Sequence, residues 1–329
     1  MAQMIVRYRE GSQYRWAVVL REAPSSASDA IQVRVINTTA ATTAQILADL
    51  DRPGGRENLA DGETVTLRAG DLVSPITADG SLLCQGLNYA EHAAEAQQAA
   101  RKQNLFFAKA SSSICGSYDE IVRPPEVELL DYEVEFGVVL RSGVSAKATV
   151  TNDNVGDFVA GVVLANDVSA RDVMFGASFL QWFQGKSYRT FCPLGPVLYL
   201  LNRDEIAEAL VNLEIKLWVN GELRQSAKSS QLIFKPAETI EQMSQVVDLK
   251  PGDVILTGTP GGVTAPATPK LVEILKTHLL ADGPRRDAIR AEMSSGRPFL
   301  QEGDVVTASI RDLRSDRNLG GLQNRIVAH

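Results

Sequence analysis

The segment Asp131–Leu140, DYEVEFGVVL, combines three acidic side chains with a run of apolar residues. Side chains of a β-strand alternate between its two faces, so Glu133 and Glu135 are expected to point in the same direction. The apolar run 136–140 favours a strand that is buried on both faces. Two buried carboxylates repel each other unless a cation offsets their charge, and hard dications bind several oxygen ligands. Spacing alone leaves open the alternative, a half-exposed strand with a solvated acidic face.

A second polar segment, NDVSARD, follows the apolar run Phe158–Ala165. That run predicts a buried strand, and Asp167 would lie at its carboxyl end, where sites are commonly built. The sequence SARD at 169–172 is a helix-start pattern. Arg171 would then lie in the first helical turn, where the helix macrodipole disfavours a cation. An arginine placed against this local preference is a candidate functional residue.

The rest of the chain predicts strands and helices without regular alternation. This pattern favours a mixed α+β fold over a doubly wound parallel sheet. Residues 1–78 are expected to form a small N-terminal α+β appendage, and 79–329 the catalytic domain, with a helical insert at about 264–303. The predicted strands include Met4–Tyr8, Trp16–Leu20, Ile31–Ile36, Leu213–Val219, Val254–Leu256 and Asp304–Ile310. The predicted helices are Thr43–Leu50, Tyr89–Lys102, Leu271–Leu280 and Arg286–Met293. Asn220-Gly221 predicts a hairpin turn.

Composition excludes several classes of function. The 329 residues carry a formal net charge of −7, which argues against binding to nucleic acid or to anionic lipid. The three cysteines, Cys84, Cys115 and Cys192, form no CxxC pair, so a zinc knuckle or dithiol redox motif is not expected. No secretory signal or membrane-spanning stretch is recognisable. These features favour a cytoplasmic enzyme or binding protein in a reducing compartment.

The segment GLNYAEHAAE places His92 and Glu95 three residues apart on a predicted helix. The two side chains would share one helix face and could form a hydrogen bond. A carboxylate behind an imidazole fixes its tautomer and raises its basicity, which is the construction of a general base. The alternative is an ordinary surface pair, and the sequence context has to decide between the two.

Two glycine-containing segments are weaker signals. Gly185-Lys186-Ser187 lacks the glycine that a phosphate-binding loop needs five residues earlier, because Leu180 stands there. We therefore reject a phosphate loop. The turn TGTPGG beginning at Thr257 could present backbone N–H groups to an anion, or could simply be a tight turn.

Nine segments in this order resemble the fumarylacetoacetate hydrolase family. They are GLNYAEHAAE, FFAKASSSICGSYDEI, DYEVEFGVVL, NDVSARD, QWFQGKS, PLGP, VNGELRQ, PGDVILTGTPGGV and GGLQNRIV, spread over residues 82–327. The resemblance implies a mixed β-roll or incomplete-barrel core, a homodimer, and Mg²⁺ or Mn²⁺ (with Ca²⁺ as a substitute in crystals). The implied metal ligands are Glu133, Glu135 and Asp167.

The resemblance also implies roles for other residues. The N-Y-x-x-H-x-x-E helix is similar to that of the acylpyruvase branch, where a His–Glu dyad activates water; here it consists of His92 and Glu95. Lys186 is expected to stabilise the developing negative oxygen. The substrate contacts are expected from Tyr89, Arg171, Gln181, Gly258 and Thr259.

These residues lead us to expect a metal-dependent hydrolase that cleaves a carbon–carbon bond in a small 2,4-diketo acid. Candidate substrates are acylpyruvates and fumarylpyruvate- or fumarylacetoacetate-like products of aromatic catabolism. The alternative is an isomerase, tautomerase, decarboxylase or hydratase of the same fold, acting on oxaloacetate-like or 2-hydroxydienoate substrates. The helical insert and Arg189 are expected to shape a pocket for a larger or more acidic substrate.

Overall fold

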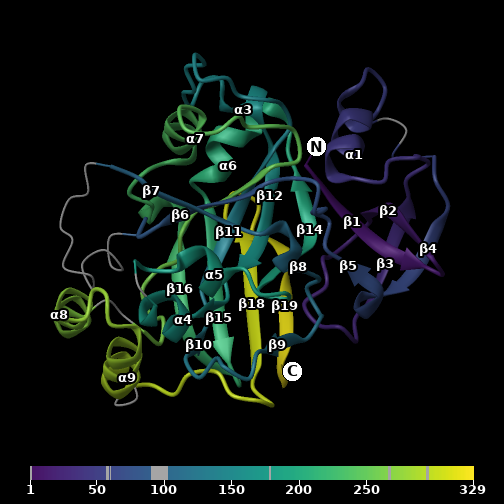
Figure 1. Cartoon of the computed structure of the whole chain (residues 1–329). Coiled ribbons are helices and arrows are strands. Elements are labelled where there is room, and N and C mark those ends of the chain that lie inside the picture. The colour runs from purple at the N-terminus through teal and green to yellow at the C-terminus, as the bar shows by residue number, and fades with distance from the viewer. Residues whose placement is uncertain are drawn as a thin grey trace.

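A large mixed sheet forms the centre of the computed structural model, which describes residues 2–56, 59, 61–89, 103–177, 179–265, 268–293 and 296–329 (Figure 1). The strand order is β4-β3-β2-β1-β14-β12-β11-β17-β6-β7, with β5 added to β1 and β8 added to β14. Their bounds are β1 Gln3–Glu10, β2 Gln13–Val19, β3 Ala30–Val35, β4 Thr64–Arg68, β5 Leu72–Val73, β6 Leu82–Gly86, β7 Leu105–Lys109, β8 Ile114–Cys115, β11 Val134–Leu140, β12 Val159–Asn166, β14 Cys192–Leu200 and β17 Val254–Leu256.

A second sheet packs beside the first. Its order is β16-β15-β18-β19-β9, and a two-stranded pair joins β10 to β13. The bounds are β9 Ile121–Arg123, β10 Leu130–Asp131, β13 Ser169–Ala170, β15 Leu213–Val219, β16 Glu222–Lys228, β18 Val305–Asp312 and β19 Arg317–Ala328. The predicted hairpin turn is confirmed, because Asn220 and Gly221 join β15 to β16 with φ values of 51° and 82°. Positive φ at both central residues suits the twist of a two-residue hairpin.

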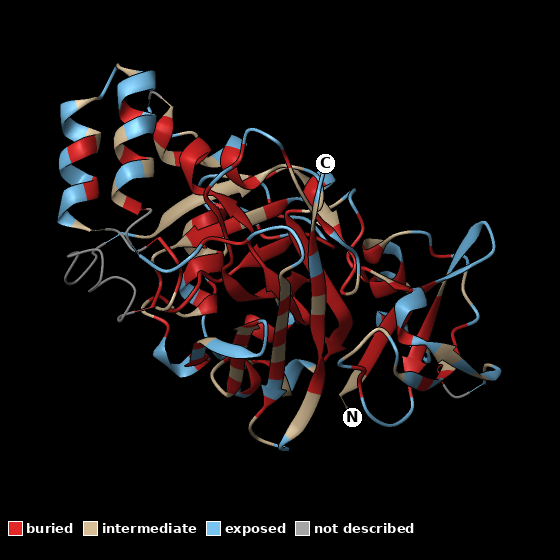
Figure 2. Ribbon diagram, turned by 90° about the horizontal axis from the view of Figure 1, so that it is seen from below, coloured by how far each residue is buried: buried red, intermediate tan, exposed pale blue. Residues whose placement is uncertain are grey.

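Strands β11 and β12 are buried along their whole length, and Figure 2 shows that buried residues fill the middle of the molecule. Alternate side chains of these strands pack into two different hydrophobic clusters, for example Val138 and Val162 in one and Val139 and Val163 in the other, so neither face reaches water. The register pairs Val134 with Asn166 and Glu135 with Ala165. This register brings the start of β11 next to the residue that follows β12, Asp167.

Helices cover the sheets and form one projecting pair. The bounds are α1 Thr43–Asp51, α3 Val155–Phe158, α4 Arg171–Gly176, α5 Trp182–Lys186, α6 Ile206–Leu210, α7 Pro236–Ser244, α8 Pro269–Thr277 and α9 Asp282–Met293. Thr268 caps α8 by accepting a hydrogen bond from the backbone N–H of Leu271, and Pro269 occupies the first turn. None of the described helices has the length and apolar content needed to cross a bilayer.

The N-terminal strands continue the central sheet. β1 pairs antiparallel with β14 over three residue pairs, from Gln3–Leu200 to Ile5–Leu198. A side-chain contact reinforces this connection: the Arg141 guanidinium, at the residue after β11, donates to both carboxylate oxygens of Asp51 at 2.8 Å. In Figure 1 these purple and blue strands lie to one side of the green core, with α1 beside them.

One local prediction is wrong. SARD does not form a capped helix start, because α4 begins at Arg171 without a side-chain cap and Ser169 belongs to β13. Pairing with β10 draws Ser169 into the strand, where its hydroxyl instead accepts a hydrogen bond from Lys186. Asp172 accepts hydrogen bonds from the backbone N–H groups of Glu128 and Leu129. Residues 90–102 of the helix expected at Tyr89–Lys102 lie outside the described residues.

Candidate metal centre

Three buried carboxylates meet where β11 begins and β12 ends. Glu133 precedes β11, Glu135 is its second residue, and Asp167 follows β12. One oxygen of each group lies within 4.8 Å of the others. Backbone pairing fixes the arrangement, since the Asp167 N–H donates to the Glu133 carbonyl at 2.8 Å and the Glu133 N–H donates to Asn166 Oδ1 at 3.0 Å. The residues named as metal ligands in the sequence therefore lie together.

Lys186 lies between two of these carboxylates. Its Nζ donates to Glu133 Oε2 at 2.8 Å, to Asp167 Oδ2 at 2.6 Å and to the Ser169 hydroxyl at 2.7 Å. Burial lowers the pKa of Lys186, but the carboxylates of Asp167 and Glu133 outweigh it and the net pKa is raised. Lys186 is therefore an ammonium ion, which supplies positive charge and protons but cannot act as a base in this state.

Two further cations complete the network. Lys109, the last residue of β7, donates to Asp167 Oδ1 at 2.5 Å with its side chain fully buried. Arg171 forms ion pairs with Asp131 at 2.9 Å and with Glu133 at 2.7 Å. Buried charges persist only when they are paired and hydrogen-bonded, and this network meets that condition.

Glu135 is compensated less completely than its neighbours. Its Oε2 accepts a hydrogen bond from the Gly258 N–H at 2.7 Å. Burial, and then the negative charges of Asp167 and Glu133, raise the pKa of Glu135 well above its ordinary value, against smaller opposing effects of Lys186 and this N–H. A carboxyl group in this position gains most from an added cation.

The donor set fits a divalent ion with oxygen ligands. The ligand atoms are all carboxylate oxygens, which suit Mg²⁺ or Mn²⁺ better than the softer metals that prefer thiolate or imidazole. Among the described residues, the cluster holds four carboxylates (Asp131, Glu133, Glu135 and Asp167) and three cations (Lys109, Arg171 and Lys186). Its formal charge of −1 becomes +1 when a dication binds, and the centre then attracts an anion.

A cavity of about 280 Å³ opens onto this cluster. Glu133, Glu135, Arg171, Lys186 and Thr259 contribute polar groups to it, and most of the remaining lining is apolar. A concave, mostly apolar space with a few convergent polar groups is the usual form of a small-molecule site. The cavity and the carboxylates therefore define one candidate site.

The expected substrate contacts are distributed unevenly. Arg171 and Thr259 line the cavity, whereas Tyr89, Gly258, Gln181 and Arg189 are not among its lining residues. The Gly258 N–H is directed to Glu135, and the Thr259 hydroxyl donates to the Val134 carbonyl at 2.9 Å. Gln181 is the residue before α5.

Tyr89 is buried, and its hydroxyl has no hydrogen-bond partner among the described residues. Burial, and then the charge of Glu135, raise its pKa, so the phenol stays protonated. His92 and Glu95, the expected dyad, lie outside the described residues.

Sequence reasoning missed two members of the network. Lys109 ends the segment LFFAK, and Asp131 lies two residues before Glu133. Asp131 accepts hydrogen bonds from the backbone N–H groups of Thr264 and Ala265, in addition to its pairing with Arg171. A lone lysine at the end of an apolar strand is the one local signal that could have identified Lys109, because an unpaired ammonium is not buried.

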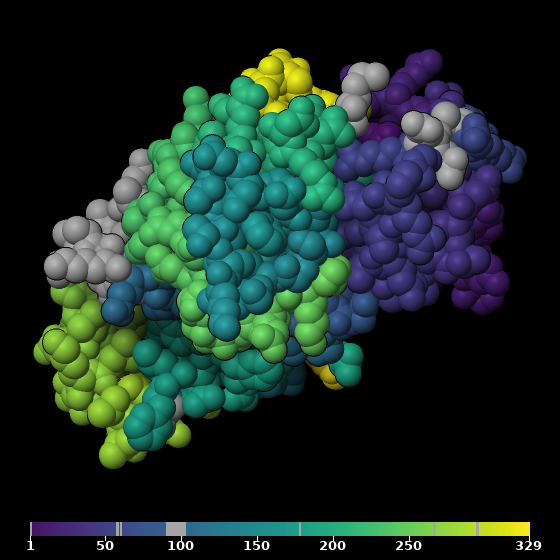
Figure 3. All heavy atoms as spheres, turned by 90° about the horizontal axis from the view of Figure 1, so that it is seen from above, coloured from purple at the N-terminus to yellow at the C-terminus, as the bar shows by residue number. Residues whose placement is uncertain are grey.

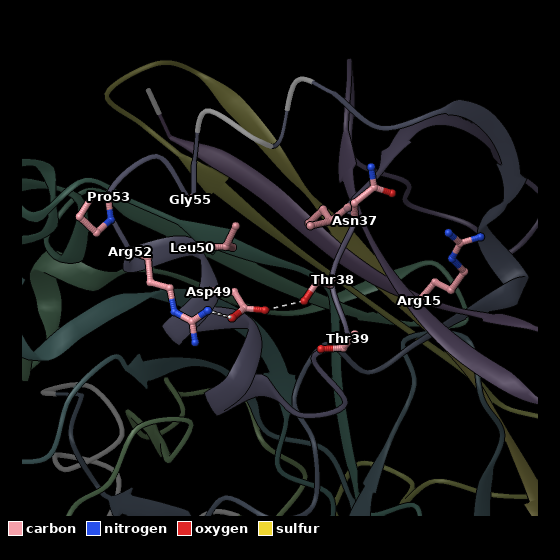
Figure 4. Close-up of a pocket in the computed structure, with 10 residues that line it drawn as sticks. Arg15, Asn37, Thr38, Thr39, Asp49, Leu50, Arg52, Pro53 and Gly55 are labelled. Atoms are coloured by element: carbon pink, nitrogen blue, oxygen red, sulfur yellow. Dashed lines mark hydrogen bonds and ion pairs between the residues drawn. The ribbon is translucent and has the colours of Figure 1, made fainter.

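A second and larger cavity of about 630 Å³ lies between the N-terminal strands and α1 (Figure 4). Figure 4 shows Asp49 between Thr38 and Arg52. The Thr38 hydroxyl donates to Asp49 at 2.5 Å, and Arg52 contacts it at 3.2 Å. Among the described residues that line this cavity, Asp49 is the one carboxylate, so they do not offer the several acidic ligands that a metal centre requires.

Comparison with known proteins gives concordant results. The family profile "Fumarylacetoacetate (FAA) hydrolase C-terminal" matches residues 81–327. The mitochondrial oxaloacetate tautomerase FAHD2B of Bos taurus is 45% identical over 192 residues, which are 58% of this chain and 59% of that protein. The chain thus matches less than two thirds of the bovine relative's length. The mitochondrial oxaloacetate tautomerase fahd2 of Xenopus laevis is 40% identical over 256 residues, 78% of this chain and 68% of that protein.

A solved structure extends the likeness to the whole chain. It is a probable 2-hydroxyhepta-2,4-diene-1,7-dioate isomerase from Mycobacterium abscessus, with a TM-score of 0.74 and 26% identity. The match covers 100% of this chain and 99% of that one. The N-terminal strands are therefore part of the shared architecture.

Proposed function

The chain belongs to the fumarylacetoacetate hydrolase family, and we propose that it is a divalent-metal-dependent enzyme that interconverts the keto and enol forms of an oxaloacetate-like 2-keto acid. The names of the bovine and frog relatives favour this tautomerase function over the carbon–carbon hydrolysis that the sequence motifs first suggested. Hydrolysis becomes the second candidate.

The observation that carries the proposal is the buried carboxylate cluster at one end of an apolar cavity. Glu133, Glu135 and Asp167 would hold the metal ion. When bound, a dication polarises the carbonyl oxygen of a 2-keto acid and makes the neighbouring C–H group more acidic. Arg171 and Lys186 line the same cavity, and their positive charges would orient the substrate carboxylate.

Tautomerisation moves one proton from carbon to oxygen and breaks no carbon–carbon bond. Lys186, held as an ammonium ion by Glu133 and Asp167, would favour the negative charge that develops on the enolate oxygen. His92, with Glu95 behind it, is the proposed proton carrier. The apolar walls limit the access of water, which otherwise competes for the proton.

Hydrolysis of a 2,4-diketo acid is the second candidate, and the His92-x-x-Glu95 spacing favours it. The same dyad that accepts a proton from carbon could accept one from water. Water would then attack the distal carbonyl, and cleavage of the adjacent carbon–carbon bond would release a carboxylic acid and the enolate of a smaller 2-keto acid, which takes up the proton. The two functions differ in their products, which makes them easy to separate.

The test follows the enol absorbance of oxaloacetate with Mn²⁺-loaded protein, with EDTA-treated protein, and with His92→Ala. We expect loaded protein to accelerate equilibration, and His92→Ala to lose it while keeping its metal content. His329→Ala, a change at the exposed C-terminal residue, is the matched control. Mass spectrometry of an acylpyruvate reaction reports hydrolysis. A released carboxylic acid without oxaloacetate turnover would favour the second candidate, and inactivity on both would contradict both.

A further inference from the structure

The amide of Gln225 lies outside the cavity lining and joins two parts of the metal centre. Gln225 is the last residue of the segment VNGELRQ, belongs to β16 and is 1% exposed. Its Oε1 accepts a hydrogen bond from the Val134 N–H at 2.9 Å. Its Nε2 donates to the Thr259 hydroxyl at 2.8 Å and to the Pro260 carbonyl at 3.0 Å. One buried side chain therefore connects the start of β11 with the turn that follows β17.

The three contacts fix the orientation of the amide. The Val134 N–H can only donate, so the atom that meets it must be the carbonyl oxygen of Gln225. The Pro260 carbonyl can only accept, so the atom that meets it must be the amide nitrogen. A rotated amide would oppose two donors and two acceptors. The arrangement thus depends on a side chain that has both a donor and an acceptor at its end.

The hydrogen bonds of Gln225 are part of a closed ring. The Val134 N–H donates to Gln225, and Gln225 donates to the Thr259 hydroxyl. The Thr259 hydroxyl in turn donates to the Val134 carbonyl at 2.9 Å. Each residue therefore donates to one member of the ring and accepts from the other. Removing one side chain leaves a buried polar group of each remaining residue without its partner, which costs free energy.

The ring holds the backbone that carries two of the expected metal ligands. Val134 lies between Glu133 and Glu135, and the ring engages both its N–H and its carbonyl. Thr259 follows Gly258, whose N–H donates to Glu135 Oε2 at 2.7 Å. The ring therefore controls the backbone from which both glutamates extend and the donor that orients one of them. Groups behind the ligands of a metal orient those ligands and tune its binding.

Strand β16 departs from regular pairing where Gln225 is needed. Its pairing with β15 passes over Arg224, which makes Arg224 the extra residue of a β-bulge. Bulges re-aim neighbouring side chains and are common next to active sites. The turn after β17 packs closely against this bulge, because a Cβ atom on Gly262 would lie 2.1 Å from the Arg224 carbonyl oxygen. The local backbone is thus shaped to bring Gln225 against the turn.

We propose that Gln225 is a positioning residue of the metal centre, which holds Glu133 and Glu135 in the arrangement that binds a divalent ion. The proposal rests on the proposed metal-dependent function and adds a residue that belongs neither to the carboxylate cluster nor to the cavity lining. Its role is to pre-arrange the ligands, so its loss should weaken metal binding before it affects anything else.

The experiment is a calorimetric titration of metal-stripped protein with Mn²⁺. Gln225→Leu keeps a side chain of similar size and removes all three hydrogen bonds. We expect its dissociation constant for Mn²⁺ to rise by about 10- to 100-fold, the range found when groups that orient metal ligands are changed. Gln225→Asn keeps an amide but is one methylene shorter, so it should weaken binding by a smaller factor. It also provides the test if Gln225→Leu does not fold.

Matched controls separate positioning from general loss of stability. Asn324 is a fully buried amide whose nitrogen donates to three backbone carbonyls between residues 116 and 119. Thr43 of α1 has a buried hydroxyl that donates to the Pro75 carbonyl at 3.0 Å. Figures 1 and 3 show α1 at the opposite end of the molecule from α8, which lines the cavity. Asn324→Leu and Thr43→Val should lower the urea midpoint in EDTA and leave the Mn²⁺ dissociation constant unchanged.

A second substitution tests the ring itself. Thr259→Val removes the hydroxyl that links Gln225 to the Val134 carbonyl. If the ring acts as one unit, combining Thr259→Val with Gln225→Leu should weaken Mn²⁺ binding by much less than the product of the two separate factors. Independent effects that multiply would show that the two side chains act separately, and would overturn the ring.

The outcomes distinguish this proposal from the one it rests on. Equal Mn²⁺ affinity in the unmodified protein and in the Gln225 variants would overturn the positioning role and leave the metal-dependent function intact. The same weakening in Asn324→Leu as in Gln225→Leu would also overturn it. Metal binding that depends on Gln225, without any turnover of oxaloacetate, would support the positioning role and contradict the tautomerase function. Unmodified protein that binds no Mn²⁺ would contradict both proposals.

Discussion

Ion pairs have different surroundings at the cavity near the N-terminal strands and at the metal centre. Near the N-terminal strands, Arg52 contacts Asp49 at 3.2 Å with its side chain 72% exposed. At the metal centre, Lys109 contacts Asp167 at 2.5 Å with both side chains fully buried. An exposed pair contributes little because water competes for both charges. A buried pair has lost its water, so its charges depend on each other and on any cation that enters.

This difference in burial distinguishes the cavity that has the features of an active site from the one that does not. Burying several charges costs free energy. Apolar residues of similar volume often stabilise a fold equally well or better. The exposed pair needs no special explanation. The network at Glu133, Glu135 and Asp167 has the oxygen ligands of a divalent metal site.

The largest expected effect is the loss of the metal. Glu135→Gln removes a ligand charge while keeping the side-chain shape, so we expect bound Mn²⁺ to fall below one ion per chain and activity to drop by about three orders of magnitude. Metal analysis after gel filtration and the enol assay measure the two effects. Asp49→Asn at the other cavity should change neither, and full metal occupancy in Glu135→Gln would refute the ligand assignment.

The next effect concerns stability. Lys109→Met leaves Asp167 with one buried partner fewer, and we expect the free energy of unfolding without metal to fall by about 3 kcal/mol. Arg52→Met removes a cation from the exposed pair and should cost about 1 kcal/mol or less. Urea unfolding in EDTA measures both values. Equal losses of unfolding free energy in the two variants would show that burial does not distinguish these two ion pairs.

Added Mn²⁺ sharpens that comparison. The ion supplies positive charge near Asp167, so it should recover part of the stability that Lys109→Met loses. It should have the same effect on Arg52→Met as on the unmodified protein. The shift of the unfolding midpoint on adding metal, compared across the three proteins, gives the answer.

The smallest effect is a pH dependence. The raised pKa of Glu135, caused first by burial and then by Asp167 and Glu133, means that the folded metal-free protein holds a proton that the unfolded chain releases at the ordinary glutamate pKa. Stability without metal should therefore be greatest below that ordinary value and should fall as pH rises toward the raised one. The slope is at most about 1.4 kcal/mol per pH unit for one proton. Urea unfolding in EDTA at several pH values measures it.

Metal binding and substitution test the origin of this slope. Glu135→Gln carries no titrating proton there and should lose the slope. Because Mn²⁺ displaces the proton, its affinity should increase with pH over the same interval. A slope that persists in Glu135→Gln would assign the proton to another group.

The alternation of side chains between the two faces of a strand was sufficient to predict much of the fold and the acidic cluster. Strand periodicity placed Glu133 and Glu135 on one side, and a strand end placed Asp167 where sites are built; the structure brings all three together. The structure begins the strand at Val134, one residue after the first glutamate. The pattern still worked because the Glu133 N–H donates to the Asn166 side-chain oxygen and the Glu133 carbonyl accepts from the Asp167 N–H, which keeps Glu133 aligned with the strand.

Long-range partners could not be predicted in the same way. Lys109 is 58 residues away from Asp167 in sequence, and no local pattern states that β7 and β12 end at the same point. The helix-start pattern at Ser169 failed for a related reason, since pairing with β10 outweighed local capping. Helix α8 was foreseen as part of an insert, but its place in the cavity lining depends on its tertiary packing with α9.

The hydrogen bonds between β1 and β14 have a practical consequence for anyone shortening this protein. Residues 3–5 protect one flank of the central sheet by pairing with residues 198–200. A fragment that starts where the family profile starts, at residue 81, would leave those amide and carbonyl groups bare. An unpaired strand edge can form hydrogen bonds with strands of other molecules. Such a fragment would be expected to aggregate, so expression work is better served by keeping the first β-hairpin.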